Sequence, residues 1–328
     1  MRFRFLLMLV PILIGLGVMG WHHFLALVPP KAPELRGALH TSNLEVDGVT
    51  RHFRYYVPGF LQDKPPVVFI LHASGGDGER ARKVTGYDFD LLADRNGFIA
   101  VYPDGFENHW NDCRSEATYS ARSQNIDDVG FIKGLINYFE QTHQADTSRV
   151  YATGMSNGGH LTYRLAMEMP GQFAAIASVA ANMPVEDNLD CSGEAKPLGV
   201  MIINGTADPI NPYDGGEVSL FGQKPRGHVR SSEESVQFWR DLAGYEGKGR
   251  KSKFLDVDPN DGSLIELTVW RKRGKPEVAQ LTMIGAGHVF PSKTVKLPRI
   301  LGPPNHDING AHEIWKFFTR HRNSANGA

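Results

Sequence analysis

The sequence predicts an α/β protein with a mostly parallel sheet covered by helices on both faces. From Leu44 onward, short apolar runs that end in turn residues alternate with segments of helical period. The runs are PPVVFILHAS, GFIAVYPDG, RVYATG, FAAIASVAA and PLGVMIING. Strands that alternate with helices in this way form parallel sheets in layered α/β folds. No repeat or low-complexity linker interrupts the pattern, which favours one domain.

Two local elements support this prediction. The segment LEVDGVTRHFRYYVPG reads as a hairpin that turns at Asp47-Gly48. The segment DDVGFIKGLINYFEQTH carries one apolar stripe at helical spacing, and Asp127 and Asp128 suit the N-terminus of a helix.

Composition excludes several kinds of partner. The chain has 35 Lys and Arg against 36 Asp and Glu, so no overall field attracts nucleic acid. Its 41% hydrophobic content over 328 residues can fill a sizeable core. These numbers favour a small partner without strong charge.

The N-terminus resembles an export signal. Arg2 and Arg4 form a basic start, and residues 5–21 are apolar apart from glycines and Pro11. This run lies at the lower limit for a membrane span. Residues 1–33 are therefore predicted to be a signal peptide or an N-terminal membrane anchor. Residues 34–328 are predicted to form a single folded domain that is exported to the periplasm or secreted.

The stretch RVYATGMSNGGHLTYRLA places a serine between glycines where a strand meets a helix. Gly154-Met155-Ser156-Asn157-Gly158 matches G-x-S-x-G, the sharp turn that exposes a nucleophilic serine. A phosphate-binding loop would need a Gly-Lys-Ser/Thr ending or G-x-G-x-x-G, and neither is present. Ser156 is the candidate nucleophile.

A nucleophilic serine needs a histidine base and a carboxylate that orients the histidine. Asp208 directly follows the strand PLGVMIING, and His288 follows VAQLTMIGAG. Both therefore belong at the edge of the sheet where ligands gather. The other acids and histidines considered lack this position after a strand; they are Asp187, Asp190, Asp214, His160, His228, His306 and His312.

Acyl transfer also needs donors for the oxyanion. We expect the backbone N–H groups of Asn157 and Ser74 to be these donors. Ser74 lies in the segment ILHASGGDG. Trp110 follows the strand GFIAVYPDG and is expected either to bind substrate on the rim or to be buried for stability.

Metal sites and cofactor sites are not predicted. The segment DVDPNDG begins like a calcium loop, but Asp261 replaces the required glycine and Leu267 the required glutamate. It reads better as a turn between the strands KSKFLDV and LIELTVW.

Several blocks together resemble the exported polyhydroxybutyrate depolymerase and feruloyl esterase group of α/β-hydrolases. They are LHASGG, VYPDG, HWNDC, DDVGFI, the Ser156 stretch, FAAIASVAANMP, NGTADPINPYDGG and GAGHVFP. The resemblance implies an α/β-hydrolase fold and a serine esterase with Ser156, Asp208 and His288 as its triad. This chain departs from the group at Ala73, where a glycine is common, and at Phe290, where a tryptophan is common.

The expected substrates are hydroxyalkanoate oligomers or cinnamoyl and feruloyl esters. A peptidase of the same fold is an alternative, although the chain has no length for a large cap. A membrane-tethered binding protein without catalysis is the other alternative, and the complete triad argues against it.

Cys113 and Cys191 are the only cysteines. Export would place them where thiols oxidise, so we expect a disulfide between them. The alternative is two buried free thiols.

Overall fold

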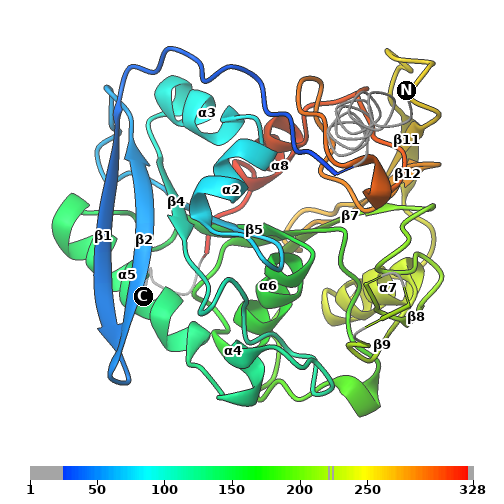
Figure 1. The fold of residues 1–328 in the computed structure, drawn as a ribbon, viewed down its shortest axis with the longest axis horizontal. Helices are drawn as coiled ribbons and strands as arrows, with labels where there is room; N and C mark the ends of the chain where they lie inside the picture. Colours follow the sequence, from blue (N-terminus) through cyan, green and yellow to red (C-terminus); the bar gives the residue numbers. More distant parts are fainter. Residues whose placement is uncertain (1–24, 221, 224, 324–328) are drawn as a thin grey trace, which may run out of the picture.

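The computed structural model describes residues 25–220, 222–223 and 225–323. Within these residues ten strands form one sheet in the order β1-β2-β4-β3-β5-β6-β7-β12-β11-β10 (Figure 1). The strands are β1 (Ala38–Val46), β2 (Val49–Val57), β3 (Val67–Leu71), β4 (Ile99–Pro103), β5 (Val150–Met155), β6 (Ala175–Val179), β7 (Gly199–Gly205), β10 (Arg250–Lys253), β11 (Leu264–Trp270) and β12 (Val278–Ile284). The run from β4 to β12 is parallel, and antiparallel strands border it on each side. This confirms the predicted α/β class.

Helices cover both faces of the sheet. Figure 1 shows α2, α3 and α8 on one side and α5, α6 and α7 on the other. The helices are α2 (Gly78–Val84), α3 (Asp88–Asn96), α4 (Ser120–Ser123), α5 (Asp128–His143), α6 (Asn157–Glu168), α7 (Ser232–Leu242) and α8 (Gly310–Phe318). Short 3₁₀ turns lie at Glu186–Asn188 and Arg299–Leu301, and a two-stranded ribbon joins β8 (Gly216–Glu217) to β9 (His228–Val229).

The alternation of side chains along the strands divides the core into two layers. On β3, Val67, Phe69 and Leu71 pack in the layer that holds α5, α6 and α7. Val68 and Ile70 point the other way and pack in the layer that holds α3 and α8. Strands buried on both faces explain why the sequence shows continuous apolar runs instead of alternation.

The predicted local elements are present. β1 and β2 pair as an antiparallel hairpin around Asp47 and Gly48, and β10 pairs antiparallel with β11. The segment Asp256–Gly262 lies between β10 and β11, as the sequence predicted. Helix α5 begins after Asp127, whose side chain accepts a hydrogen bond from the Gly130 N–H at 2.7 Å.

Part of the N-terminal segment contacts the folded domain. The predicted signal or anchor falls mainly in residues 1–24, outside the described residues. Val28 and Lys296 exchange two backbone hydrogen bonds of 2.8 and 3.0 Å. Among the described residues, no helix is both long enough and apolar enough to cross a membrane. The domain boundary near residue 33 stays a prediction.

The predicted disulfide is confirmed. Cys113 and Cys191 are bonded, with their Cα atoms 4.9 Å apart. Cys113 lies in the loop after β4 and Cys191 in the loop after β6, so the bond joins two loops at the same edge of the sheet. The bond closes a segment of 78 residues. Such a crosslink removes conformational entropy from the unfolded chain.

Replacing both cysteines by serine is expected to lower the free energy of unfolding by up to about 4 kcal/mol, as loop-closure entropy implies for this length. Urea denaturation followed by circular dichroism measures the change. Wild-type protein treated with dithiothreitol is the matched control and is expected to unfold at the same urea concentration as the double variant. Equal midpoints for the oxidised wild type and the variant would contradict the prediction.

Candidate active site

Ser156 occupies the sharp turn between β5 and α6. Its backbone has φ 56° and ψ −120°, in the left-handed half of conformational space that side chains rarely adopt. Neighbouring hydrogen bonds hold this strained turn in place. The Ser156 N–H donates to the carbonyl of Val179 on β6 at 2.8 Å, and the His160 N–H donates to the carbonyl of Ser156 at 2.9 Å. The G-x-S-x-G pattern thus has the strand, turn and helix that it predicted.

The glycines of this turn permit close packing of backbones. A Cβ atom on Gly158 would lie 2.4 Å from the carbonyl oxygen of Leu71, at the end of β3. A Cβ atom on Gly154 would lie 2.4 Å from the carbonyl carbon of Gly158. Side chains at these positions would therefore push α6 away from β5 and β3. The first turn of α6 is held close to the carboxyl ends of both strands.

His288 and Asp208 form a buried pair. The Nδ1 of His288 lies 2.7 Å from Oδ2 of Asp208, and both side chains are almost fully buried. The other carboxylate oxygen of Asp208 accepts hydrogen bonds from the N–H groups of Ile210 and Asn211, each at 2.8 Å. These three bonds fix the carboxylate. Asp190, an acid that the sequence also offered, instead forms an ion pair with Arg122.

The structure brings the predicted pair together but does not join it directly to the serine. Among the hydrogen bonds of the described residues, none links Ser156 Oγ with His288 Nε2. Hydrogen bonds of this kind are often long in enzymes without substrate and shorten in the substrate complex.

The two predicted oxyanion donors have unpaired backbone N–H groups. Ser74 lies in the turn between β3 and α2, and Asn157 is the first residue of α6. Within the described part of the chain, neither N–H donates to a protein acceptor. The Asn157 side chain is held firmly, because its Oδ1 accepts from the Trp110 N–H at 2.8 Å and its Nδ2 donates to Asp112 at 2.6 Å.

His72 holds the loop that carries Ser74. Its Nδ1 lies 2.8 Å from the Ala73 carbonyl, and its Nε2 accepts from the Gly105 N–H at 2.8 Å. Burial lowers the pKa of His72 to about 4, so the ring is neutral and carries its proton on Nδ1. The φ angle of Ala73 is not positive, so the backbone at this position does not require glycine.

Comparisons with known proteins decide the family. A family model described as Esterase PHB depolymerase matches residues 51–214, half of the chain. The chain belongs to this esterase family. A protein of Nocardia uniformis with the name "Putative esterase NocK" is 28% identical over 83% of this chain and 80% of its own length.

Two fungal relatives match this chain over smaller shares of their own length. Feruloyl esterase B of Thermothelomyces thermophilus is 38% identical over 37% of this chain and 40% of its own. An acetylxylan esterase A of Aspergillus fumigatus is 32% identical over 72% of this chain and 65% of its own. A solved acetyl xylan esterase from Aspergillus awamori has a TM-score of 0.57 at 19% identity, covering 86% of this chain and 99% of that one. The fold is that of α/β-hydrolases, and the protein is a carboxylic ester hydrolase.

Trp110 of the esterase lies in the interior and not on the exposed rim. Its exposed fraction is 0%, and its indole N–H donates to the His72 carbonyl at 3.0 Å. The ring also packs against the His72 imidazole, with ring centroids 4.8 Å apart. The expectation of a substrate contact is corrected, because no face of the ring is open. Trp110 supports the loop of His72 and Ser74, which agrees with the alternative that the sequence left open.

A buried network of charges lies behind Asn157, and sequence reasoning did not find it. Asp112 and Arg114 form two hydrogen bonds, of 2.5 and 3.1 Å, and Arg114 also donates to the Tyr119 hydroxyl. Burial alone would raise the pKa of the Asp112 carboxyl, but the Arg114 guanidinium outweighs burial and lowers it. In the sequence this pair appears only as an acid and a base on either side of Cys113, a pattern that does not indicate burial.

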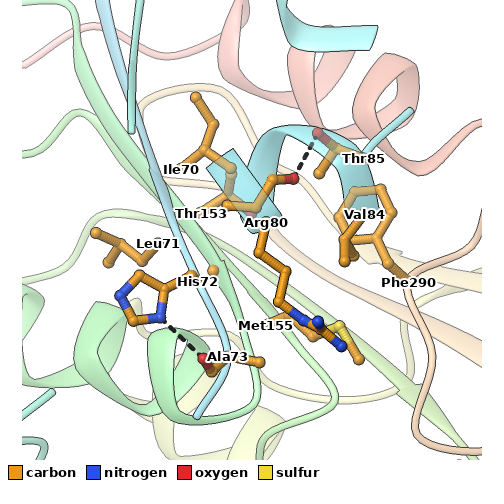
Figure 2. Close-up of a pocket in the computed structure, with 12 residues that line it drawn as sticks. Ile70, Leu71, His72, Ala73, Arg80, Val84, Thr85, Thr153, Met155 and Phe290 are labelled. Atoms are coloured by element: carbon orange, nitrogen blue, oxygen red, sulfur yellow. Dashed lines mark hydrogen bonds between the residues drawn. The ribbon is translucent and has the colours of Figure 1, made fainter. Parts of the chain in front are cut away.

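A small cavity opens next to the turn of Ser156. It has a volume of about 40 Å³, and Figure 2 shows its lining. Ala73 and Met155 border it beside the predicted oxyanion loop and nucleophile, and Phe290 closes another side. Arg80 of α2 lies along it in Figure 2. Within the described residues, no cluster of three or more His, Cys, Asp or Glu side chains is arranged to hold a metal.

Replacing Gly158 by alanine is expected to lower both the thermal unfolding midpoint and the esterase activity. The new Cβ would lie 2.4 Å from the Leu71 carbonyl oxygen and 2.6 Å from that of His72, so α6 must shift. Differential scanning fluorimetry and hydrolysis of p-nitrophenyl butyrate measure the two effects.

The matched control is Gly134→Ala in helix α5, where the nearest heavy atom would be 3.4 Å from the new Cβ. In a helix, alanine is favoured over glycine by roughly 0.5–1 kcal/mol, so this variant should be neutral or more stable. Equal behaviour of the two variants would show that the close approach of α6 is unimportant.

Proposed function

We propose that the esterase acts through a triad of Ser156, His288 and Asp208 and an acyl-enzyme intermediate. The observation that carries the proposal is the buried 2.7 Å contact between His288 Nδ1 and Asp208. Ser156, in its strained turn, follows a parallel strand of the same sheet, so all three residues come after carboxyl ends of strands at one edge. A carboxylate on Nδ1 leaves Nε2 as the ring nitrogen able to accept the serine proton. It also stabilises the imidazolium that forms.

In the first step, Ser156 Oγ attacks the ester carbonyl and His288 takes the hydroxyl proton. The N–H groups of Asn157 and Ser74 donate to the oxyanion that develops on the carbonyl oxygen. The intermediate then collapses, the bond to the alcohol oxygen breaks, and His288 returns the proton to the departing alcohol. A water molecule activated by His288 attacks the acyl-enzyme in the same manner and releases the acid.

The cavity beside Ser156 supports a short acyl group. A water molecule needs about 10–15 Å³ of this kind of volume, so a cavity of about 40 Å³ holds roughly three groups of that size. An acetyl group matches this volume, a hydroxybutyryl group is larger than the cavity, and a feruloyl group is larger still. Of the two expected acyl groups the hydroxybutyryl group is the smaller, so hydroxyalkanoate oligomers are the preferred substrate class, with cinnamoyl and feruloyl esters as the second class.

Export from the cytoplasm fits the same proposal. The Cys113–Cys191 disulfide is of a kind that persists in oxidising compartments such as the periplasm or the exterior. The basic and apolar start of the chain has the pattern of an export signal. Export is proposed for either form of the N-terminal segment, cleaved or retained as an anchor.

Ser156→Ala is expected to reduce ester hydrolysis by at least about 10⁴-fold, because the variant lacks the nucleophile but loses little packing. Rates on p-nitrophenyl butyrate, hydroxybutyrate trimer and methyl ferulate, compared with wild type, test both the role and the order of substrates. An unchanged unfolding midpoint controls for folding. A variant that keeps more than about a hundredth of the wild-type rate would exclude Ser156 as nucleophile.

The roles of Asp208 and His288 are tested by a double variant. If the two residues work as one unit, Asp208→Asn combined with His288→Ala should be little slower than His288→Ala alone. Steady-state kcat values for the two single variants and the double variant give the comparison. Losses that multiply would mean that Asp208 acts independently of His288.

A further inference from the structure

Arg226 is a buried arginine close to the candidate active site. It lies between β8 and β9, and only 8% of the residue is exposed. Its backbone is fixed on both sides, because its N–H donates to the Val218 carbonyl at 2.9 Å and its carbonyl accepts from the Asn188 amide at 3.3 Å. The side chain therefore extends from a defined point.

The guanidinium of Arg226 has no carboxylate partner. It lies over the Tyr119 ring, with its central carbon 5.0 Å from the ring centroid. Among the described residues it forms no ion pair and no side-chain hydrogen bond. The guanidinium nitrogens are not fully enclosed by protein atoms, so they reach solvent. A largely buried arginine thus has its charged end in contact with solvent.

Arg114 lies near the same tyrosine ring but has a carboxylate partner. Its guanidinium carbon is 5.8 Å from the centroid of the same Tyr119 ring, but it is fully paired with Asp112. Arginine is rarely this buried without a partner, because removing its charge from water is costly. Of the two arginines on this ring, Arg114 is neutralised by the protein and Arg226 is not. The positive charge of Arg226 is left for a ligand.

The contacts connect Arg226 to the reaction centre. Asn157 follows Ser156 and donates to Asp112, which pairs with Arg114, and Arg114 donates to the Tyr119 hydroxyl. His160, one turn after Ser156, is close enough to both His288 and Arg226 for each to affect its titration. Burial, followed by the charge of Arg114, lowers the pKa of His160, so this ring adds no charge.

The small cavity and Arg226 are formed by different residues: neither Arg226 nor Tyr119 lines the cavity. The cavity is lined by α2, the ends of β3 and β5, and Phe290. Arg226 belongs to the group around Tyr119, which contacts the first turn of α6 through Asp112 and Asn157. If the acyl group enters the cavity, the group around Tyr119 remains available for the alcohol half of the ester.

We propose that Arg226 binds a free carboxylate on the alcohol half of the ester, so that the enzyme favours esters whose leaving group is itself a hydroxy acid. Its planar guanidinium offers parallel N–H donors that match the two oxygens of a carboxylate. This inference rests on the proposed function, and a hydroxyalkanoate oligomer with a free acid end has the required carboxylate. No covalent step is added, because Arg226 binds the leaving group and does not react.

The test uses two substrates that each contain one ester bond. One is the 3-hydroxybutyrate dimer with its terminal carboxylate, and the other is the same dimer with that group as a carboxamide. Wild type is expected to have a kcat/KM at least about tenfold higher on the acid, mainly through KM, because a hydrogen bond to a charged group is stronger than a neutral one. Arg226→Gln is expected to abolish this ratio, and Arg226→Lys to retain part of it.

Arg230→Gln is the matched control, since Arg230 lies just beyond β9 and packs on Phe238. It should keep the wild-type ratio. A wild-type ratio near one, or an unchanged ratio in Arg226→Gln, overturns the inference. Equal losses on both substrates in Arg226→Gln also overturn it, because they indicate a structural role on Tyr119.

Folding and function are separated by two further measurements. Thermal unfolding shows whether Arg226→Gln folds, and if it does not, the wild-type ratio and the lysine variant decide. Hydrolysis of p-nitrophenyl butyrate by wild type tests the proposed function without any carboxylate. If wild type does not hydrolyse p-nitrophenyl butyrate, the esterase mechanism is contradicted. If it does, but its kcat/KM is the same on the acid and the amide dimer, only the role of Arg226 is contradicted.

Discussion

The close approach of helix α6 to strands β3 and β5 is the constraint on which the site depends. Ser156 has positive φ, and this strained conformation lasts only where the surroundings fix it. Gly158, against the Leu71 carbonyl, lets the helix begin immediately after the serine. The same packing sets the direction of the first N–H of α6. A helix placed farther away would leave the serine without its turn and Asn157 without its contact to the next loop.

Asn157 extends this constraint into the loop after β4. The side-chain amide of Asn157 accepts a hydrogen bond from the Trp110 N–H and donates one to Asp112. The indole N–H of Trp110 in turn donates to the carbonyl of His72. Cys113 lies between the two members of the Asp112 and Arg114 pair, and its disulfide ties this loop to the segment after β6. The covalent bond and the ion pair thus stabilise one loop from adjacent positions. This explains how an irregular segment can position the donors of the proposed oxyanion site.

The sequence predicted the features that depend on local pattern. The strands before Ser156 and Asp208, the hairpin at Asp47 and the disulfide follow from apolar runs, turn residues and cysteine number. The burial of Trp110 was not decided, because its partner Asn157 is 47 residues away. That Arg226 lacks a carboxylate partner also depends on the three-dimensional fold. A sequence shows where charges occur but not which of them fold within reach of an opposite charge.

The imidazole rings of His72, His160 and His288 have different partners. His72 is bound between two backbone groups, and burial holds its pKa at about 4. His160 has a buried Nδ1 without a hydrogen-bond partner among the described residues and two arginines nearby, so its charged form is disfavoured. His288 alone of the three has a carboxylate on Nδ1. Since burial disfavours an imidazolium and a neighbouring carboxylate stabilises it, this difference supports His288 as the base and leaves the other two rings as neutral parts of the scaffold.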